Sequence, residues 1–283
     1  MQSTTAALWI VATPIGNLGD FSDRARRTLV DVALIAAEDT RHSARLTRHL
    51  GIDTPMISLH EHNESARIEK IIERLAAGDS VALISDAGTP LISDPGYALV
   101  GAVRAAGYPV LAVPGACAAI AALSVAGLPS DRFVFEGFLS SKASARKTRL
   151  AELADENRTL IFYESNHRIE RCVRDIAAMF GPQRRIGLCR ELSKLHEQSI
   201  VLEAEALCAW LSEDDNRRRG EFVLVVAGAP DVERTAGEIA LDDLLRELLA
   251  LTGTKQAAKA AARLTGGATN DIYARALELS AAD

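Results

Sequence analysis

One short loop carries the residue types best suited to binding chemistry. The segment SDAGTPLISDPG, residues 85–96, follows the apolar run VALI and contains two Asp, two Pro and two Gly. Proline lacks a backbone donor and glycine adds conformational freedom, so neither a strand nor a helix continues through this segment. We therefore expect ligand binding by Asp86. For Asp94 we expect an N-cap role, because Pro95 would occupy the first helical position.

Two charged groups near strand ends are candidates for acid–base chemistry. Glu38, Asp39 and Arg41 follow one apolar run, and the segment RELSKLHE, residues 190–197, contributes a second group that includes Lys194. Charged side chains in such positions either form ion-pair networks or act as acids and bases in a shared cleft. The residue types alone leave both alternatives open.

Two further motifs lack the residues that familiar ligands need. TPIGNLGD, residues 13–20, is neither G-x-G-x-x-G nor a Walker sequence, so it predicts no dinucleotide or triphosphate site. HEHNE, residues 60–64, is not H-E-x-x-H, and neighbouring side chains on an extended segment point in opposite directions. We expect a polar wall there, with Asn63 or Ser65 capping the next helix, and no metal. The cysteines are far apart and predict neither disulfides nor a zinc site: Cys117, Cys172, Cys189 and Cys208.

The elements that would position these loops follow a regular alternation. Apolar runs alternate with amphipathic segments such as residues 64–79, in which Ile71 and Leu75 fall on one helical face. This pattern predicts a mostly parallel sheet with helices on both sides, and ligands bind beyond the carboxyl ends of such strands. The runs lie at residues 8–13, 33–39, 56–59, 81–86 and 110–115. The loops that follow them should therefore form one pocket.

The alternation restarts after an alanine-rich stretch, which predicts a second α/β domain. The runs at 184–192 and 198–204 leave almost no room for a helix, so these two strands should be antiparallel. We expect an N-terminal α/β domain at 1–116, a mixed-sheet α/β domain at 117–230, and a linker with a helical tail at 231–283.

The tail should end in two helices joined at TGGATN, with Thr269 or Asn270 as the second N-cap. The helical pair is either a packing appendage or an element that carries Lys255, Lys259 and Arg263 toward RNA. Both alternatives remain open from the residue types.

Composition and charge restrict the partners only weakly. The 283 residues are 48% apolar and 25% charged, with a net charge of −6. No apolar run approaches the roughly 20 residues that span a bilayer, and the first residues lack a basic start, so we expect a cytoplasmic protein without membrane association. Basic clusters at 41–48, 142–149 and 216–220 either attract a polyanion or form solvated helix faces.

Seven ordered segments resemble those of the tetrapyrrole methylase superfamily, and in particular its bacterial 16S rRNA cytidine-2′-O-methyltransferases. They are LWIVATPIGNLGD, IAAEDTR, HEHNE, ISDAGTPLISDPG, VPGACA, FYESNHR and RELSKLHE. The resemblance covers about residues 8–228, with a similar helical tail. The superfamily usually carries Gly-Asp-Pro in the central loop. The sequence DAGTP stands there instead and favours the rRNA branch over the porphyrin-modifying branch.

The resemblance implies a cleft between two α/β domains that holds S-adenosylmethionine. It implies a reaction in which the sulfonium methyl moves to a ribose 2′-hydroxyl, with 16S rRNA or the 30S subunit as partner and a homodimeric enzyme. Glu38 or Asp39 would act as base, with Lys194 or Arg41 as electrostatic partner. The implied cofactor-binding residues are Pro14, Asp86, Gly88, Thr89, Pro90, Cys117 and Ala118, with Phe162 from the second domain. The competing functions are a tetrapyrrole methyltransferase acting on a small-molecule carbon, and a catalytically silent RNA-binding assembly factor.

Overall fold

The computed structural model describes residues 6–60, 63–230 and 241–282, which fall into two compact units. The first unit ends at Ala229 and contains two β-sheets, and the second begins at Pro230 and is helical. Among the described residues, no helix is both long and apolar enough to cross a membrane. The predicted boundaries at 116 and 230 stay predictions.

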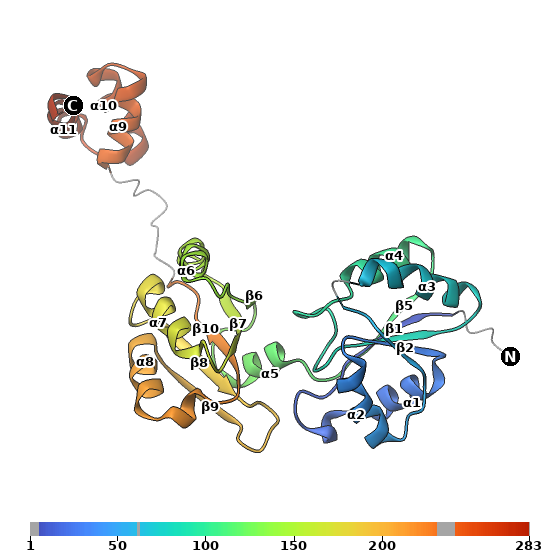
Figure 1. The fold of residues 1–283 in the computed structure, drawn as a ribbon. Helices are drawn as coiled ribbons and strands as arrows, with labels where there is room; N and C mark the ends of the chain where they lie inside the picture. Colours follow the sequence, from blue (N-terminus) through green and yellow to red (C-terminus); the bar gives the residue numbers. More distant parts are fainter. Residues whose placement is uncertain (1–5, 61–62, 231–240, 283) are drawn as a thin grey trace. The chain divides into compact units, whose positions relative to one another are not determined.

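The first sheet has five parallel strands in the order β3-β2-β4-β1-β5. Helices α1 and α2 cover one face, and α3 and α4 cover the other (Figure 1). The strands are β1 (Leu8–Val11), β2 (Leu34–Ala37), β3 (Met56–Ser58), β4 (Val81–Ile84) and β5 (Val110–Val113). The helices are η1 (Leu18–Asp20), α1 (Asp23–Asp31), α2 (Thr40–Leu50), α3 (Glu64–Ala76) and α4 (Tyr97–Ala105). The predicted parallel sheet with helices on both faces is confirmed.

The central strands of this sheet are apolar on both faces. Ile35 and Ile84 pack with Leu29 of α1, and Leu83 packs on the other side with Leu99 of α4. Every residue of β2 and β4 is buried, which is typical of a parallel strand covered on both sides. The polar loops that follow these strands therefore emerge together at one edge of the sheet.

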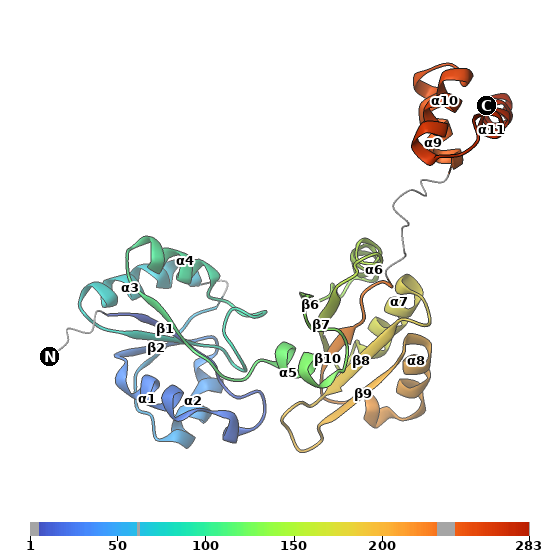
Figure 2. The ribbon, with the colours of Figure 1, turned by 180° about the vertical axis from the view of Figure 1, so that it is seen from behind.

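The second sheet is mixed, in the order β6-β7-β10-β8-β9, with only β6 and β7 parallel. Helices α6, α7 and α8 cover one face and α5 covers the other (Figure 2). The strands are β6 (Phe133–Phe138), β7 (Thr159–Ser165), β8 (Arg185–Arg190), β9 (Gln198–Glu203) and β10 (Glu221–Val226). The helices are α5 (Ala118–Val125), α6 (Ala143–Glu152), α7 (Ile169–Phe180), α8 (Ala204–Glu213) and η2 (Asp215–Arg218). The predicted antiparallel pairing of β8 with β9 is confirmed.

The second unit consists of α9 (Leu241–Leu251), α10 (Thr254–Thr265) and α11 (Thr269–Ala282). Small and apolar side chains form its core: Leu245, Ala258, Ala261, Ala262, Ile272 and Ala276. Gly266, at φ 72°, ends α10 in the left-handed conformation that glycine favours. Helix α11 begins at Thr269 itself, so the prediction of Thr269 or Asn270 as its N-cap was one or two residues too late.

Candidate active site

Three loops at the carboxyl edge of the first sheet are hydrogen-bonded into one wall. Thr13 and Gly88 exchange backbone hydrogen bonds, with N···O distances of 2.8 and 3.1 Å. The Thr89 hydroxyl donates to the Ala116 carbonyl at 2.9 Å. Gly88 has φ 82°, and a Cβ there would lie 3.3 Å from Ile15 Cγ2, so a larger residue would be strained and crowded. Loop 85–96 is thereby fixed between its two neighbours.

Aromatic residues of the second sheet form the facing wall. The Tyr163 hydroxyl accepts a hydrogen bond from the Ala119 backbone N–H at 3.1 Å, which connects β7 to the start of α5. Phe135 and Phe138 pack edge-on against the Tyr163 ring, with centroid separations of 5.0 and 5.5 Å. Phe138 is 56% exposed at this wall.

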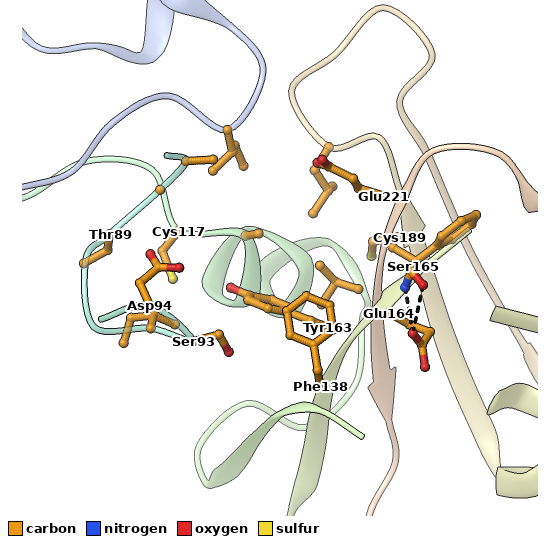
Figure 3. A pocket seen from close by; sticks show the side chains of 18 residues that line it. Thr89, Ser93, Asp94, Cys117, Phe138, Tyr163, Glu164, Ser165, Cys189 and Glu221 are labelled. Carbon is orange, nitrogen blue, oxygen red and sulfur yellow. Dashed lines mark hydrogen bonds between the residues drawn. The ribbon is translucent and has the colours of Figure 1, made fainter. Parts of the chain in front are cut away.

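A cavity of about 360 Å³ lies between the two walls (Figure 3). Sites for small molecules typically have volumes of roughly 300–1,000 Å³ and mainly apolar linings with a few polar groups. Four of the residues implied by the family resemblance line this cavity: Gly88, Thr89, Cys117 and Ala118. The remaining lining residues include Ile15, Ile92, Asp94, Phe138, Tyr163, Glu164, Ser165, Leu192, Glu221 and Phe222. The pocket predicted at the strand ends is therefore present.

Pro14, Asp86 and Pro90 are not among the lining residues. The Asp86 carboxylate accepts a hydrogen bond from the Asp39 backbone N–H at 3.1 Å, and the Asp86 N–H donates to Glu38 at 3.3 Å. These two bonds join the ends of β2 and β4. Asp86 therefore supports the loop through these hydrogen bonds, whereas we had expected it to contact a ligand.

Phe162 also lies elsewhere than the resemblance implied. Its side chain is fully buried between the second sheet and helices α6–α8. Successive side chains of a strand point to opposite faces, so Tyr163, one residue further, is the side chain of β7 that faces the cavity. The cavity is thus lined by Tyr163 and not by Phe162, and the role of Phe162 in cofactor binding stays a prediction.

Asp94 lines the cavity, and the expected N-cap role is wrong. The N-cap position of α4 is occupied by Gly96, two residues after Asp94, and the helix begins at Tyr97. Asp94 Oδ2 is buried and has no hydrogen-bond partner within the described part of the chain. Leu91 and Ser93, which precede it, have positive φ values of 74° and 67°, a costly conformation that is concentrated at functional sites.

The surroundings of Asp94 raise its pKa to about 6. Burial is the main cause, a hydrogen bond from Ser85 opposes it, and the carboxylates of Glu38 and Asp86 raise the pKa further. Both aspartates follow a serine in the same loop, and the one sequence feature that separated them, Pro95 after Asp94, pointed to an N-cap role that the structure does not show.

We expect the Asp94→Asn variant to be more stable than the parent chain at neutral and alkaline pH. A raised native pKa favours folding below the unfolded value of about 3.9, and this contribution is lost as the pH rises through about 6. After a discount for partial exposure, the free energy of unfolding of the variant should exceed that of the parent by about 1–2 kcal/mol above pH 6. Urea unfolding at several pH values tests this, and an equal difference at about pH 4 and about pH 8 would contradict it.

The group Glu38, Asp39 and Arg41 lies outside the cavity lining. Asp39 caps α2 by accepting from the Arg41 N–H at 2.8 Å and pairs with the Arg41 guanidinium at 3.3 Å, which lowers the Asp39 pKa. The Arg41 side chain is 91% exposed. Burial raises the Glu38 pKa, although the Asp86 N–H opposes this effect. The geometry therefore does not bring the expected base and its partner to the cavity.

Lys194 also lies outside the lining and is held by two carboxylates. Its Nζ is 3.0 Å from Glu191 Oε1 and 2.8 Å from Glu221 Oε2. Burial alone would lower the Lys194 pKa, but the hydrogen bonds to Glu221 and Glu191 raise it. A Cβ at Gly16, which has φ 150°, would lie 2.3 Å from Lys194 Cγ. Lys194 thus brings the loop after β8 against the loop after β1.

The described residues contain no group of three or more His, Cys, Asp and Glu side chains arranged to hold a metal. Positions 61 and 62 of HEHNE lie outside the described residues. Asn63 precedes α3 but makes no side-chain cap, and its Oδ1 accepts from the His60 N–H at 2.9 Å. All four cysteines are free thiols.

Comparisons with known proteins agree with this architecture. Residues 7–208 match the family model "Tetrapyrrole (Corrin/Porphyrin) Methylases", and residues 235–280 match "RsmI C-terminal HTH domain". Among solved structures, uroporphyrin-III-C-methyltransferase from Thermus thermophilus is 19% identical with a TM-score of 0.55, covering 79% of this chain and 95% of that one. Diphthine synthase is 14% identical with a TM-score of 0.57, covering 78% and 90%. At these identities the structures show the shared fold alone.

Curated relatives are much more similar in sequence. Ribosomal RNA small subunit methyltransferase I of Pseudomonas aeruginosa is 53% identical over 277 residues, covering 97% of this chain and 98% of the relative. The protein of the same name from Escherichia coli O157:H7 is 48% identical over 279 residues, covering 98% and 96%. The chain therefore belongs to the tetrapyrrole methylase family, in its ribosomal RNA small subunit methyltransferase I group.

Proposed function

We propose that this chain transfers a methyl group from S-adenosylmethionine to the ribose 2′-hydroxyl of a cytidine in the decoding centre of 16S rRNA. Relatives that are about half identical over nearly the whole chain, and that are named as small-subunit rRNA methyltransferases, support the substrate class. The observation that carries the proposal is the cavity whose walls come from both sheets. We place the enzyme in the cytoplasm and infer a homodimer.

The cavity residues fit S-adenosylmethionine. Gly88 would let the cofactor approach the backbone, while Thr89, Cys117 and Ala118 continue the same wall. The apolar lining suits an adenine ring, and the buried carboxylate of Asp94 suits a cationic ligand. When bound, the cofactor supplies a methyl group on a positively charged sulfur. The protein would position the ribose hydroxyl in line with that methyl and provide a group that takes its proton.

Of the three basic clusters, the one at 41–48 on helix α2 is best placed to contact RNA phosphates. Arg45 and Arg48 are exposed, and neither forms an ion pair with another described residue. The other clusters are largely paired internally, through Arg146 with Asp175, Arg149 with Glu136, Arg217 with Glu213, and Arg218 with Glu170. In the second unit, Lys255, Lys259 and Arg263 recur every four residues along α10 and are all exposed. We assign this stripe a supporting role in RNA binding.

The double substitution Arg45→Ala and Arg48→Ala should weaken binding to 16S rRNA and to RNA of any other sequence by a similar factor. Each phosphate contact that is lost should reduce the slope of log affinity against log salt by about 1, so we expect a total change of about 2. Filter binding or fluorescence anisotropy over a range of salt concentrations measures the slope. Arg104→Ala, on the helix that covers the opposite face of the first sheet, is the matched control. An unchanged slope in the double variant would exclude α2 from the interface.

The function is tested by transfer of labelled methyl from S-adenosylmethionine to 30S subunits that lack the modification. Free 16S rRNA and a porphyrin precursor serve as alternative substrates, and mass spectrometry identifies the modified nucleoside. Label in 2′-O-methylcytidine is the expected result and shows which state of the RNA is the substrate. Label in the porphyrin alone would assign the chain to the other branch of its superfamily. RNA binding without transfer would indicate an assembly factor.

A further inference from the structure

We propose that a second cavity receives the target cytidine, and that Glu197 selects cytosine over uracil by accepting a hydrogen bond from the exocyclic amino group. This inference rests on the proposed function and adds the residue that reads the base. The second cavity has a volume of about 420 Å³. Its lining shares Ile15, Cys117 and Leu192 with the cavity that fits the cofactor, so the two cavities adjoin each other.

The position of the reacting hydroxyl explains why the base belongs in this second cavity. The 2′-hydroxyl and the base are attached to neighbouring carbons of one ribose, so a ribose at the cofactor's methyl group holds its base close by. A nucleotide enters a protein cavity only when its base leaves the stack, and enzymes that extrude a nucleotide read the Watson–Crick edge of its base. The second cavity offers Ile15, Val125 and Leu192 to the ring and polar groups to that edge.

The Asp, Glu and Ser side chains of this lining are arranged as hydrogen-bond acceptors. The Ser193 hydroxyl donates to the Asp20 carboxylate, and the Ser124 hydroxyl donates to the Ala121 carbonyl at 2.7 Å. Both hydroxyl protons are therefore used within the protein. No Lys, Arg or His side chain belongs to the described lining of this cavity. A base that enters it thus meets oxygen lone pairs, which pair with an N–H group and not with a carbonyl oxygen.

Glu197 is the acceptor of this lining that a backbone group holds in place. Its Oε2 accepts from the Ser193 N–H at 2.7 Å, and its Oε1 makes no hydrogen bond to a described residue. The backbone donor fixes Glu197 more firmly than a rotatable hydroxyl fixes Asp20. Glu191 and Ser193, in the same loop, have positive φ values of 51° and 69°, a costly conformation that is concentrated at functional sites. Glu197 therefore presents one unengaged carboxylate oxygen from a well-defined loop.

Cytosine and uracil differ in the group that such an oxygen would contact. Cytosine carries an amino group at C4, and recognition of this group by the carboxylate of a glutamate or aspartate is common. Uracil carries a carbonyl oxygen there, so two acceptors would face each other without a proton between them. A site that is built to bind a donor rejects an analogue without one, because its own polar group is left unpaired. The carboxylate would thus attract cytidine and repel uridine.

The test is a competition between 30S subunits that carry cytidine and 30S subunits that carry uridine at the target position. Mass spectrometry gives the ratio of 2′-O-methylcytidine to 2′-O-methyluridine, which reports the ratio of the two kcat/KM values when the substrates are equally concentrated. The parent chain should favour cytidine. Glu197→Gln introduces an amide that donates to uracil as readily as it accepts from cytosine, so the ratio should fall by about 10–100-fold.

Two further variants and one binding measurement separate base reading from loss of structure. Glu203→Gln makes the same chemical change at an exposed glutamate at the far end of β9, and it should leave the ratio unchanged. Glu197→Asp keeps a carboxylate and should still favour cytidine, at a lower overall rate. The dissociation constant of Glu197→Gln for S-adenosylmethionine should stay within about 3-fold of the parent value, because Glu197 does not line the cofactor cavity.

The results that contradict the inference differ from those that contradict the proposed function. An unchanged ratio in Glu197→Gln, at any overall rate, would show that Glu197 does not read the base. A ratio that falls in Asp20→Asn but not in Glu197→Gln would assign the selection to Asp20, and the inference would fail. Equal methylation of cytidine and uridine by the parent would also overturn the inference, while transfer to a ribose hydroxyl would stand. A parent chain that binds S-adenosylmethionine but methylates neither subunit would overturn the proposed function itself.

Discussion

Truncation of Phe162 to alanine should lower the free energy of unfolding by about 3–5 kcal/mol, the usual cost of removing a fully buried phenylalanine ring. The ring packs among Leu150, Leu188 and Leu224 in the core between the second sheet and its helices, so its loss leaves a cavity. Urea unfolding of the whole chain measures the effect. Trp210 packs against the same core and Trp9 against the first sheet, so fluorescence in a Trp9→Phe background reports on the second sheet alone.

The neighbouring residue provides the control. Tyr163→Phe keeps the ring and removes only the hydroxyl that accepts from Ala119, so about 1 kcal/mol should be lost. Phe162→Ala should lower the free energy of unfolding. Under conditions in which the variant is folded, its affinity for the cofactor should equal that of the parent. A folded, stable Phe162→Ala variant with weakened cofactor binding would restore the role that the family resemblance implied.

The fold followed from the sequence because buried strands and helical faces leave clear patterns. The run VALI became β4 at Val81–Ile84, and the runs at 184–192 and 198–204 became β8 and β9. In α3, Ile71 and Leu75 are both buried on the face that the spacing indicated. The close spacing of two runs also predicted the antiparallel pairing of β8 with β9. Each of these features depends on the spacing of apolar residues over a short stretch of chain, which can be seen in the sequence itself.

The site was less predictable because its contacts join distant segments. Residues 159–162 of β7 are all buried, so the apolar pattern does not show that Tyr163, rather than Phe162, faces the cavity. Similarly, Asp86 and Asp94 have similar local sequences. A hydrogen bond from a neighbouring strand end engages Asp86, whereas Asp94 Oδ2 is buried at the cavity and has no hydrogen-bond partner among the described residues. Neither difference is visible until the sheet is assembled.

The basic clusters show the same limit, since charge density in a sequence does not distinguish exposed from buried arginines. Arg146 lies in the cluster KASARKTR, yet it is 5% exposed and its guanidinium is 2.7 Å from the carboxylate of Asp175. It also donates to the backbone carbonyls of Ser140 and Ser141. This arginine therefore connects α6 to α7 and to the loop before α6, and it is not available to RNA.

Replacing Arg146 with alanine should consequently reduce stability, and RNA binding should be unaffected where the variant is folded. Removing one partner of a buried ion pair leaves the other charge uncompensated and typically costs about 3–5 kcal/mol. Urea unfolding measures this loss, and anisotropy with 16S rRNA measures binding.

The exposed Lys142 in the same cluster provides the comparison, because Lys142→Ala should change stability by less than about 0.5 kcal/mol. The double variant Arg146→Met with Asp175→Leu removes both charges and should recover most of the loss, since a buried pair replaced by apolar residues of similar volume is often neutral. Failure of the double variant to recover stability would locate the cost in the carbonyls of Ser140 and Ser141, which lose their donor in both variants. An Arg146→Ala variant that is stable but binds rRNA weakly would instead return this cluster to the RNA interface.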